Sequence, residues 1–226
     1  FFWIPAVDHG LRINGWQQPS QRCIDIAQVY LHCGRAAMRA DLWQTDDVDV
    51  SMLCDQQWIE QARYGFIASQ DENGLSQLSP RGEVAGGFHL HGQELWWPER
   101  PGNRVAVSMR NALKQPQITL ALLHPGQAQL RWWQGSVRLT AGDEWQSFAV
   151  DGKTPTLGWR LAVKRQGKTD CQHLPDLLKL AANAHHPKLT PFAKALSEHM
   201  SGQGIMGKIT HGVVKHVVEK DKRQLY

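Results

Sequence analysis

Hydrophobic and polar residues alternate through most of the middle of the chain. Between residues 64 and 164 this period of two recurs in short runs that end at turn-forming residues, as in Asp71-Glu72-Asn73-Gly74. Such alternation is typical of strands with one buried face, and Asn-Gly favours a tight connection between two of them. The pattern predicts a mainly antiparallel β meander with strands at residues 64–69, 75–79, 84–90, 94–98, 118–124, 129–140 and 157–164.

Two strands and a helix are predicted before this meander. Residues 1–7 and 11–17 have strand-like runs joined by a turn around Asp8-His9-Gly10. From residue 24 to residue 42, apolar residues keep helical spacing on one face, and basic residues gather on another: His32, Arg35 and Arg39. Further helices are predicted at residues 56–64, 103–115, 175–184, 190–201 and 205–218. The last three are expected to form a helical appendage over residues 170–226, and the predicted fold class is mainly β with α (α+β).

Composition narrows the classes of function. The chain has 226 residues, of which 42% are hydrophobic, enough for a sizeable core. A net charge of +4, from 25 basic and 21 acidic residues, is too small to indicate a nucleic-acid partner by itself. The four cysteines form no Cys-x-x-Cys pair, which argues against structural zinc and a disulfide scaffold and favours a cytoplasmic location. No apolar run approaches the ~20 residues that cross a bilayer, so no membrane partner is expected.

Three arginines lie around two turn-forming stretches, Ser79-Pro80-Arg81-Gly82 and Arg100-Pro101-Gly102-Asn103-Arg104. A helix that begins at Asn103 would leave its first N–H groups unpaired and direct the positive end of its dipole at an anion. Arg81 would add a guanidinium suited to phosphate oxygens. The helix also has a polar stripe formed by Arg104, Ser108 and Asn111. The alternative is that these arginines are solvated and Asn103 is only a helix cap.

These residues carry a resemblance to a known family. Ser79-Pro80-Arg81-Gly82, followed by Arg100-Pro101-Gly102-Asn103-Arg104 and then by Ser108, Arg110 and Asn111, is similar to the pyridoxamine 5'-phosphate oxidase-related FMN-binding family. The resemblance implies a six-stranded split β-barrel, dimeric in most members, with FMN at the seam between two barrels. It assigns the phosphate end of the flavin to six residues: Arg81, Arg100, Asn103, Arg104, Ser108 and Asn111.

A second signature of the family lies in the first fifty residues, ahead of the phosphate motif rather than after it. It comprises Leu11-Arg12-Ile13-Asn14-Gly15 and the segment from Leu31 to Trp43. The first of these also resembles Leu130-Arg131-Trp132-Trp133-Gln134-Gly135, which suggests an internal repeat. We therefore expect residues 1–50 to be the closing half of a first barrel module and residues 52–165 to be a second module. Because Phe1 is not an initiator methionine, the chain is expected to be a fragment or a processed form.

The tandem interpretation completes the expected site from both segments. The first module would contribute Arg12, Asn14, Arg35 and Arg39 from the other side of the seam. In an enzyme of this type the flavin carries out the electron or hydride transfer, so no side chain is assigned a catalytic role, and the substrate or redox partner is left open. A homodimer is compatible with the resemblance.

Three departures from the family pattern keep other functions open. Glu83 stands where aspartate is common, residues 52–165 lack a Leu-His-Cys-type helix, and the first module lacks its opening strands. One alternative is a degenerate barrel that serves as a non-catalytic interaction module. Another is a haem-binding split barrel with a histidine ligand, for which the candidates are His32, His89, His91 and His211. No metal site is expected, because neither His89 and His91 nor the pair His185-His186 has supporting ligands nearby.

Overall fold

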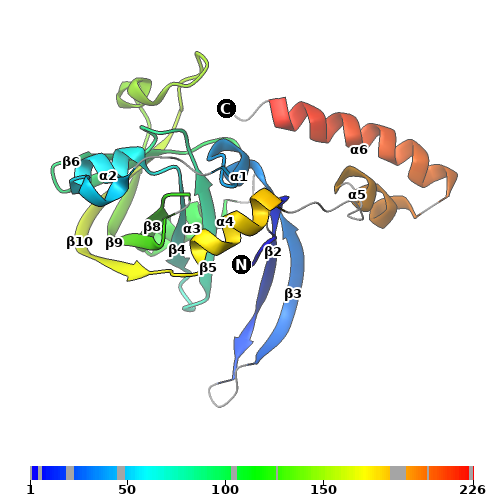
Figure 1. The fold of residues 1–226 in the computed structure, drawn as a ribbon, viewed down its shortest axis with the longest axis horizontal. Helices are drawn as coiled ribbons and strands as arrows, with labels where there is room; N and C mark the ends of the chain where they lie inside the picture. Colours follow the sequence, from blue (N-terminus) through cyan, green and yellow to red (C-terminus); the bar gives the residue numbers. More distant parts are fainter. Residues whose placement is uncertain are drawn as a thin grey trace. The chain divides into compact units, whose positions relative to one another are not determined.

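The computed structural model describes residues 2–4, 7–18, 23–44, 49–102, 106–125, 127–183, 192–202, 204–223 and 226. The chain divides into two compact units, Phe1–Asn183 and Ala184–Tyr226. Antiparallel sheets with peripheral helices make up the first unit, and helices make up the second, so the predicted α+β class is confirmed (Figure 1). The predicted boundaries of the two barrel modules stay predictions.

A seven-stranded antiparallel sheet forms the body of the first unit. Its strand order is β5-β4-β8-β9-β10-β7-β6, and neighbouring strands are antiparallel throughout. The side chains of β4 and β9 alternate between buried and more exposed, as the period-two pattern predicted. The strands are β4 (Tyr64–Gln70), β5 (Ser76–Gly82), β6 (His89–His91), β7 (Glu94–Pro98), β8 (Gln117–Leu123), β9 (Gln129–Thr140) and β10 (Gly158–Asp170).

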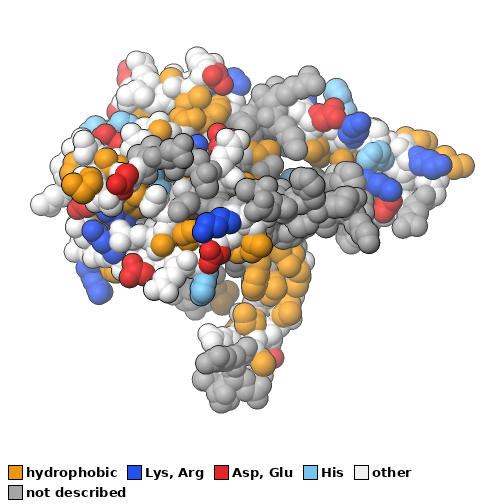
Figure 2. Space-filling model, viewed as in Figure 1, with side chains coloured by type: hydrophobic (Ala, Val, Ile, Leu, Met, Phe, Trp, Pro, Cys, Tyr) orange, Lys and Arg blue, Asp and Glu red, His pale blue; other side chains and the backbone are white. Residues whose placement is uncertain are grey.

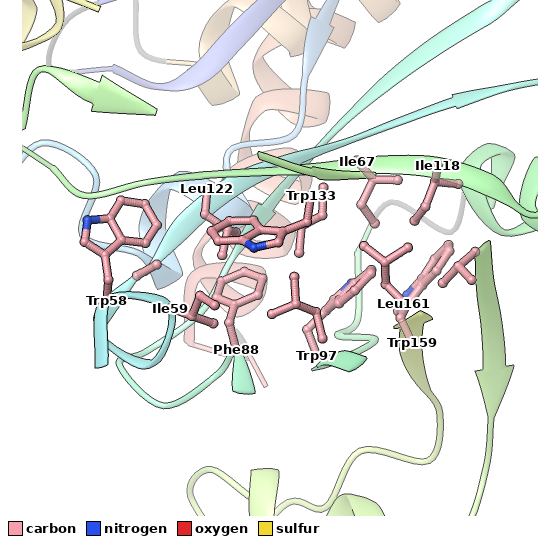
Figure 3. Packing of buried hydrophobic residues seen from close by; sticks show 14 of the residues in the cluster. Trp58, Ile59, Ile67, Phe88, Trp97, Ile118, Leu122, Trp133, Trp159 and Leu161 are labelled. Carbon is pink, nitrogen blue, oxygen red and sulfur yellow. The ribbon is translucent and has the colours of Figure 1, made fainter. Parts of the chain in front are cut away.

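Tryptophans dominate the core of this sheet. Trp97 and Trp159 stack with ring centroids 5.7 Å apart, and Trp58 and Trp133 complete the aromatic layer with aliphatic side chains between them (Figure 3). In both adjacent tryptophan pairs the second ring is the buried one, whereas Trp96 and Trp132 are half-buried. Each pair divides its rings between core and surroundings because neighbouring side chains point to opposite faces of a strand.

A separate three-stranded sheet, with the order β1-β2-β3, precedes the larger one. Its strands are β1 (Phe2–Ile4), β2 (Val7–Gln17) and β3 (Ile24–His32). The predicted turn around Asp8-His9-Gly10 is wrong, because these residues lie within β2. The predicted helix over residues 24–42 is also wrong over most of its length. Residues 24–32 pair with β2, and the short helix α1 (Arg35–Arg39) begins only after Gly34.

The two sheets meet at a seam with almost no space between backbones. A Cβ atom added to Gly82 of β5 would overlap the carbonyl oxygen of Ala36 in α1, so only glycine fits there. Trp3 Nε1 donates a hydrogen bond of 3.3 Å to the hydroxyl of Tyr64, and Trp3 also packs against Phe66. A second hydrophobic cluster continues from α1 to β4, β8 and α4. Strand β1 and helix α1 are therefore packed onto the larger sheet.

The remaining helices of the first unit lie at its periphery. Those of the first unit are η1 (Val50–Met52), α2 (Asp55–Gln61), α3 (Val107–Lys114), η2 (Asp143–Phe148) and α4 (Leu174–Asn183); the second unit contains α5 (Phe192–Ser201) and α6 (Ile205–Arg223). Helix α3 begins at Val107, later than the predicted start at Asn103. Among the described residues no helix is both long and apolar enough to cross a membrane.

Candidate functional site

A cavity with a volume of about 970 Å³ lies at the seam of the first unit. Strands β2 and β3 and helix α1 form one wall, and β5, β7, the segment after β7 and α3 form the other. Arginines from both walls line it: Arg12, Arg35, Arg39, Arg81 and Arg100. The fold thus brings together basic residues that are far apart in the sequence.

Arg12 is placed by the register between β2 and β3. It lies directly opposite Tyr30, which also lines the cavity, and only 5% of its surface is exposed. Its Nε donates a hydrogen bond of 3.1 Å to Asn14 Oδ1, and no carboxylate among the described residues pairs with it. Burial lowers the pKa of Arg12 because the charged guanidinium is removed from water. Asn14 does not line the cavity; it orients Arg12 and donates to Gln28 Oε1 at 3.2 Å.

Arg81 extends from β5, where Gln77, Ser79 and Arg81 face the cavity at alternate positions. Its guanidinium donates to both carboxylate oxygens of Glu99 at 2.7 Å. Trp159 Nε1 donates to the same carboxylate at 2.6 Å, which fixes the orientation of the ion pair. The Nε of Arg81 is buried and has no hydrogen-bond partner among the described residues. Arg81 therefore lines the cavity with its other side-chain atoms, while its Nε is buried away from solvent.

Arg100 is held by a buried carboxylate. Its Nε contacts both oxygens of Glu83 at 3.1 and 3.0 Å, and its terminal nitrogen reaches Glu83 Oε2 and the carbonyl of Phe148, each at 2.9 Å. Burial raises the pKa of Glu83 to about 7, although the hydrogen bonds and charge of Arg100 oppose this rise. Glu83 therefore positions Arg100 and is itself close to titration near neutral pH.

Helix α1 supplies the two remaining arginines. Arg39 is buried and donates to the carbonyl of Pro101 in the segment that follows β7, while Arg35 lines the cavity. The hydrogen bond from Arg39 joins the first wall to the segment that carries Arg100. The close approach of α1 to Gly82 places both side chains on the cavity side of the seam.

The cavity carries an excess of positive charge. Among the described lining residues, five arginines face two glutamates, Glu83 and Glu99, which leaves a formal excess of three positive charges. Burial lowers the pKa of His32, and the neighbouring positive charges of Arg12 and Arg81 add to this effect, against a hydrogen bond to the carbonyl of Cys33. A buried cationic cavity of this kind favours an anionic ligand.

The residues expected to hold a phosphate are only partly gathered in this cavity. Ser108 is buried and lines it, as do Arg81 and Arg100. Asn111 does not line it, and its amide donates to Ser69 Oγ at 3.2 Å instead. Asn103 and Arg104 lie outside the described residues. The predicted anion site used the N-terminus of a helix that begins at Asn103. In the structure α3 begins at Val107, so the predicted helix start is not observed.

Sequence reasoning missed several lining residues. Tyr30 and Trp97 give the cavity aromatic surface, and Glu99 supplies the carboxylate that orients Arg81. The alternation of Gln77, Ser79 and Arg81 was a usable signal, because it predicts a polar strand face that continues to Arg81. Tyr30 carried no such signal, since the segment around it was interpreted as a helix.

The candidate haem ligands are distributed over different places. His32 lines the cavity, whereas His89 and His91 stack on each other at 5.9 Å, outside it. His211 lies in the second unit, with Nδ1 3.4 Å from Ser197 Oγ. Among the residues that the structure describes, no three histidine, cysteine, aspartate or glutamate side chains converge as metal ligands would.

No protein-family model matches the chain, and no curated protein matches its sequence. Solved structures do share parts of the fold. HupZ from Group A Streptococcus is 13% identical, with a TM-score of 0.42 over 53% of this chain and 95% of that one. HutZ, the heme storage protein from Vibrio cholerae, is 13% identical, with a TM-score of 0.36 over 49% and 87% of the two chains.

A third similar structure comes from the pyridoxinephosphate oxidase family. It is a Clostridium acetobutylicum protein related to general stress protein 26 of B. subtilis, 11% identical, with a TM-score of 0.37 over 50% of this chain and 82% of that one. At these scores and identities the likeness carries no conclusion about what the present chain binds.

Proposed function

We propose that the cavity at the seam binds FMN, with the flavin phosphate among the arginines. The observation that carries this proposal is Arg12, a guanidinium that is almost fully buried, lines the cavity and has no carboxylate partner among the described residues. An uncompensated buried charge is costly, and an anionic ligand would neutralise it. The excess of positive charge over the whole lining supports a ligand with the charge of a phosphate.

The rest of the lining suits the other end of such a ligand. Tyr30, Trp97 and Met109 supply aromatic and apolar surface, and the volume of about 970 Å³ is that of a small-molecule site. Arg81 and Ser108, which also line the cavity, are further donors for phosphate oxygens. Bound FMN would supply electron or hydride transfer, and the side chains of this chain would bind and orient it and limit access of water.

A titration with FMN and riboflavin tests this proposal, because the two ligands differ in the phosphate. We expect the fluorescence of FMN to be quenched when it binds to the protein. We also expect FMN to bind at least about tenfold more tightly than riboflavin. The Arg12→Met variant keeps the aliphatic stem and should lose most of this preference. Arg138→Ala is the matched control, since Arg138 is an exposed arginine that pairs with Glu94 away from the cavity.

One observation favours the alternative that the chain is a non-catalytic interaction module. Arg81 and Arg100 are already paired with Glu99 and Glu83, so both arginines could serve only to hold the ends of β5 and β7 together. A protein that binds neither flavin would favour that function and overturn the proposal. Equal affinities for FMN and riboflavin would overturn the assignment of the phosphate. A Soret band after addition of haem, lost in His32→Ala, would instead favour the haem-binding alternative.

A further inference from the structure

A second cavity of the first unit has a volume of about 760 Å³. It lies on the face of the larger sheet that points away from the core shown in Figure 3. Strand β8 shows this arrangement, since Ala121 and Leu123 line the cavity and alternate with the core residues Leu120 and Leu122. Among the described residues, none lines both this cavity and the one at the seam, so the two are separate sites.

The walls of this second cavity are apolar. Aromatic and aliphatic side chains from β1, β4, β8, β9 and α4 form most of the lining: Trp3, Phe66, Leu123, Leu130, Leu174 and Leu177. Figure 2 shows hydrophobic side chains at the surface around α4, among charged ones. Protein interiors hold few voids larger than a water molecule, whereas small-molecule sites have volumes of about 300–1,000 Å³. The cavity therefore has the size and polarity of a site for an apolar ligand.

A small residue between two large ones produces the hollow. In the register of the sheet, Ala121 of β8 lies opposite Phe66 of β4 on one side and Trp132 of β9 on the other. Side chains that lie opposite each other in a sheet share a face, so the methyl group of Ala121 leaves a gap between two aromatic rings. Leu174 and Leu177 of α4 line the same cavity, so this helix borders the gap without filling it.

The charge of the second cavity is opposite in sign to that of the first. Asp170, at the end of β10, is the only lining residue among those described that has a formal charge at neutral pH, with His173 counted as neutral. Its carboxylate has no hydrogen bond or ion pair with the described part of the chain. No described lysine or arginine lines this cavity, whereas arginines dominate the cavity at the seam. A carboxylate beside apolar walls favours a cationic head group over an anionic one.

We propose that this second cavity binds an amphiphilic amine, with the apolar part of the ligand against the sheet and the ammonium group beside Asp170. Burial of the apolar part supplies most of the affinity, because the walls are otherwise in contact with water. Asp170 supplies the preference for positive charge and disfavours a fatty acid of the same length. The assignment does not depend on flavin binding, since the two cavities are separate, and either proposal can fail without the other.

Isothermal titration calorimetry with decylamine, decanol and decanoate tests the class of ligand. The three compounds share one alkyl chain and differ in the charge of the head group, and they are used at pH 8 below the concentrations at which they form micelles. We expect decylamine to bind at least about fivefold more tightly than decanoate, with decanol between them. Absence of binding for all three would overturn the site. Equal affinities, or tighter binding of decanoate, would overturn the preference for a cation.

Two variants test the residues that carry the proposal. Asp170→Asn should abolish the difference between decylamine and decanoate and leave the affinity for decanol unchanged. Asp176→Asn is the matched control, because Asp176 is an exposed aspartate of α4 outside the cavity lining, and it should keep the difference. Ala121→Phe should fill the hollow and weaken binding of all three compounds at least about tenfold. Ala162→Phe adds the same ring at an exposed position of β10 outside the cavity and should bind as the wild type does.

Far-UV circular dichroism checks that these variants are folded. An Ala121→Phe protein that is folded and still binds all three compounds would overturn the location. An Asp170→Asn protein that keeps the full preference for decylamine would overturn the part assigned to the carboxylate.

Two free cysteines report the location of the bound amine independently. Cys171 lines the second cavity and Cys33 lines the cavity at the seam, and both are half-buried. Alkylation with iodoacetamide, followed by mass spectrometry of the peptides, gives the rate at each thiol in the unmodified sequence. We expect decylamine to slow alkylation of Cys171 at least about threefold and to leave that of Cys33 unchanged. Protection of Cys33 instead of Cys171, or of neither, would contradict the proposal.

Discussion

The β2–β3 and β9–β10 hairpins share a local sequence pattern, but the arginine of each has different neighbours. Each has a Leu-Arg pair followed by a glycine at a bulge: Gly15 in the first hairpin and Gly135 in the second. Arg131 is neutralised within the chain, since it donates to Asp55 at 2.8 Å and lies 4.5 Å from the centre of the Trp58 ring. Arg12 is equally buried but lines a cavity and has no such carboxylate. A shared pattern can thus serve as core structure in one place and as a candidate ligand site in another.

The largest expected effect concerns the two glycines. An added Cβ would overlap the carbonyl oxygen of Ala162 at Gly135 and that of Asp25 at Gly15. Because Gly135 is buried in the larger sheet, Gly135→Ala should lower the free energy of unfolding by about 3 kcal/mol or more, and Gly15→Ala, in the exposed hairpin, by about 1 kcal/mol. Urea denaturation of both variants measures the difference. Equal losses would show that the two hairpins are equally constrained.

The carboxylate that pairs with Arg131 and the one that pairs with Arg100 differ in burial. Asp55 is more than half exposed, whereas burial raises the pKa of Glu83 to about 7. A raised pKa means that the folded state holds the proton more tightly than the unfolded state does. The stabilisation is therefore complete below the ordinary pKa of glutamate and is lost as the pH rises through about 7.

The size of that effect follows from the shift. The difference in unfolding free energy between the wild type and Glu83→Gln should fall by up to about 3 kcal/mol between acidic and neutral pH, at ~1.4 kcal/mol for each pKa unit. Chemical denaturation at several pH values measures it, with Asp55→Asn as the control. A difference that rises with pH would mean that Arg100 dominates and that the pKa of Glu83 is lowered.

Removing Arg131 should affect stability and leave ligand binding unchanged. Arg131→Met loses the ion pair with Asp55 and the contact with the Trp58 ring, and we expect the free energy of unfolding to fall by about 1–2 kcal/mol. Flavin titration of the same variant should match the wild type. A loss of FMN affinity in Arg131→Met would remove the distinction between the two hairpins.

The smallest expected effect has the opposite sign. Because Arg12 is buried without a carboxylate, Arg12→Met should raise the stability of the ligand-free protein by about 0.5–1 kcal/mol. Thermal unfolding without ligand measures it, and addition of FMN should stabilise the wild type more than the variant. If Arg12→Met destabilises the free protein, the arginine is already well solvated or paired and no longer requires an anion.

The sequence predicted most of the larger sheet well and the hairpin beside it poorly. Within the larger sheet, the strand predicted at residues 84–90 is wrong over most of its length, because β6 covers only His89–His91. β9 was expected at residues 129–140 and β7 at residues 94–98, and both have these bounds, since regular alternation and clear turn residues mark them. β3 was interpreted as a helix because the bulge at Ala27 interrupts the period of two. The resulting interval of three between Ile26 and Val29 matches the spacing of a helix.

The residues of the candidate site, like the strands, were predicted only in part. The resemblance to a known family named Arg12, Arg35, Arg39, Arg81, Arg100 and Ser108, and the structure places all six around one cavity. It did not separate them from Asn14 and Asn111, whose side chains bind neighbouring residues instead. That distinction depends on the rotation of each strand or helix at the seam, which only tertiary packing fixes. The part played by Glu99 and Trp159 in orienting Arg81 is likewise a property of the folded chain.

The contact between Gly82 and Ala36 has a consequence for the speed of ligand capture. Two backbones in direct contact leave no room for the cavity walls to approach each other further at that point, so we expect little change in their separation when a ligand binds. Little reorganisation then precedes binding, and encounter is guided mainly by the positive potential of the walls. Association with an anion should therefore be fast and should slow steeply as salt is added, while dissociation responds far less.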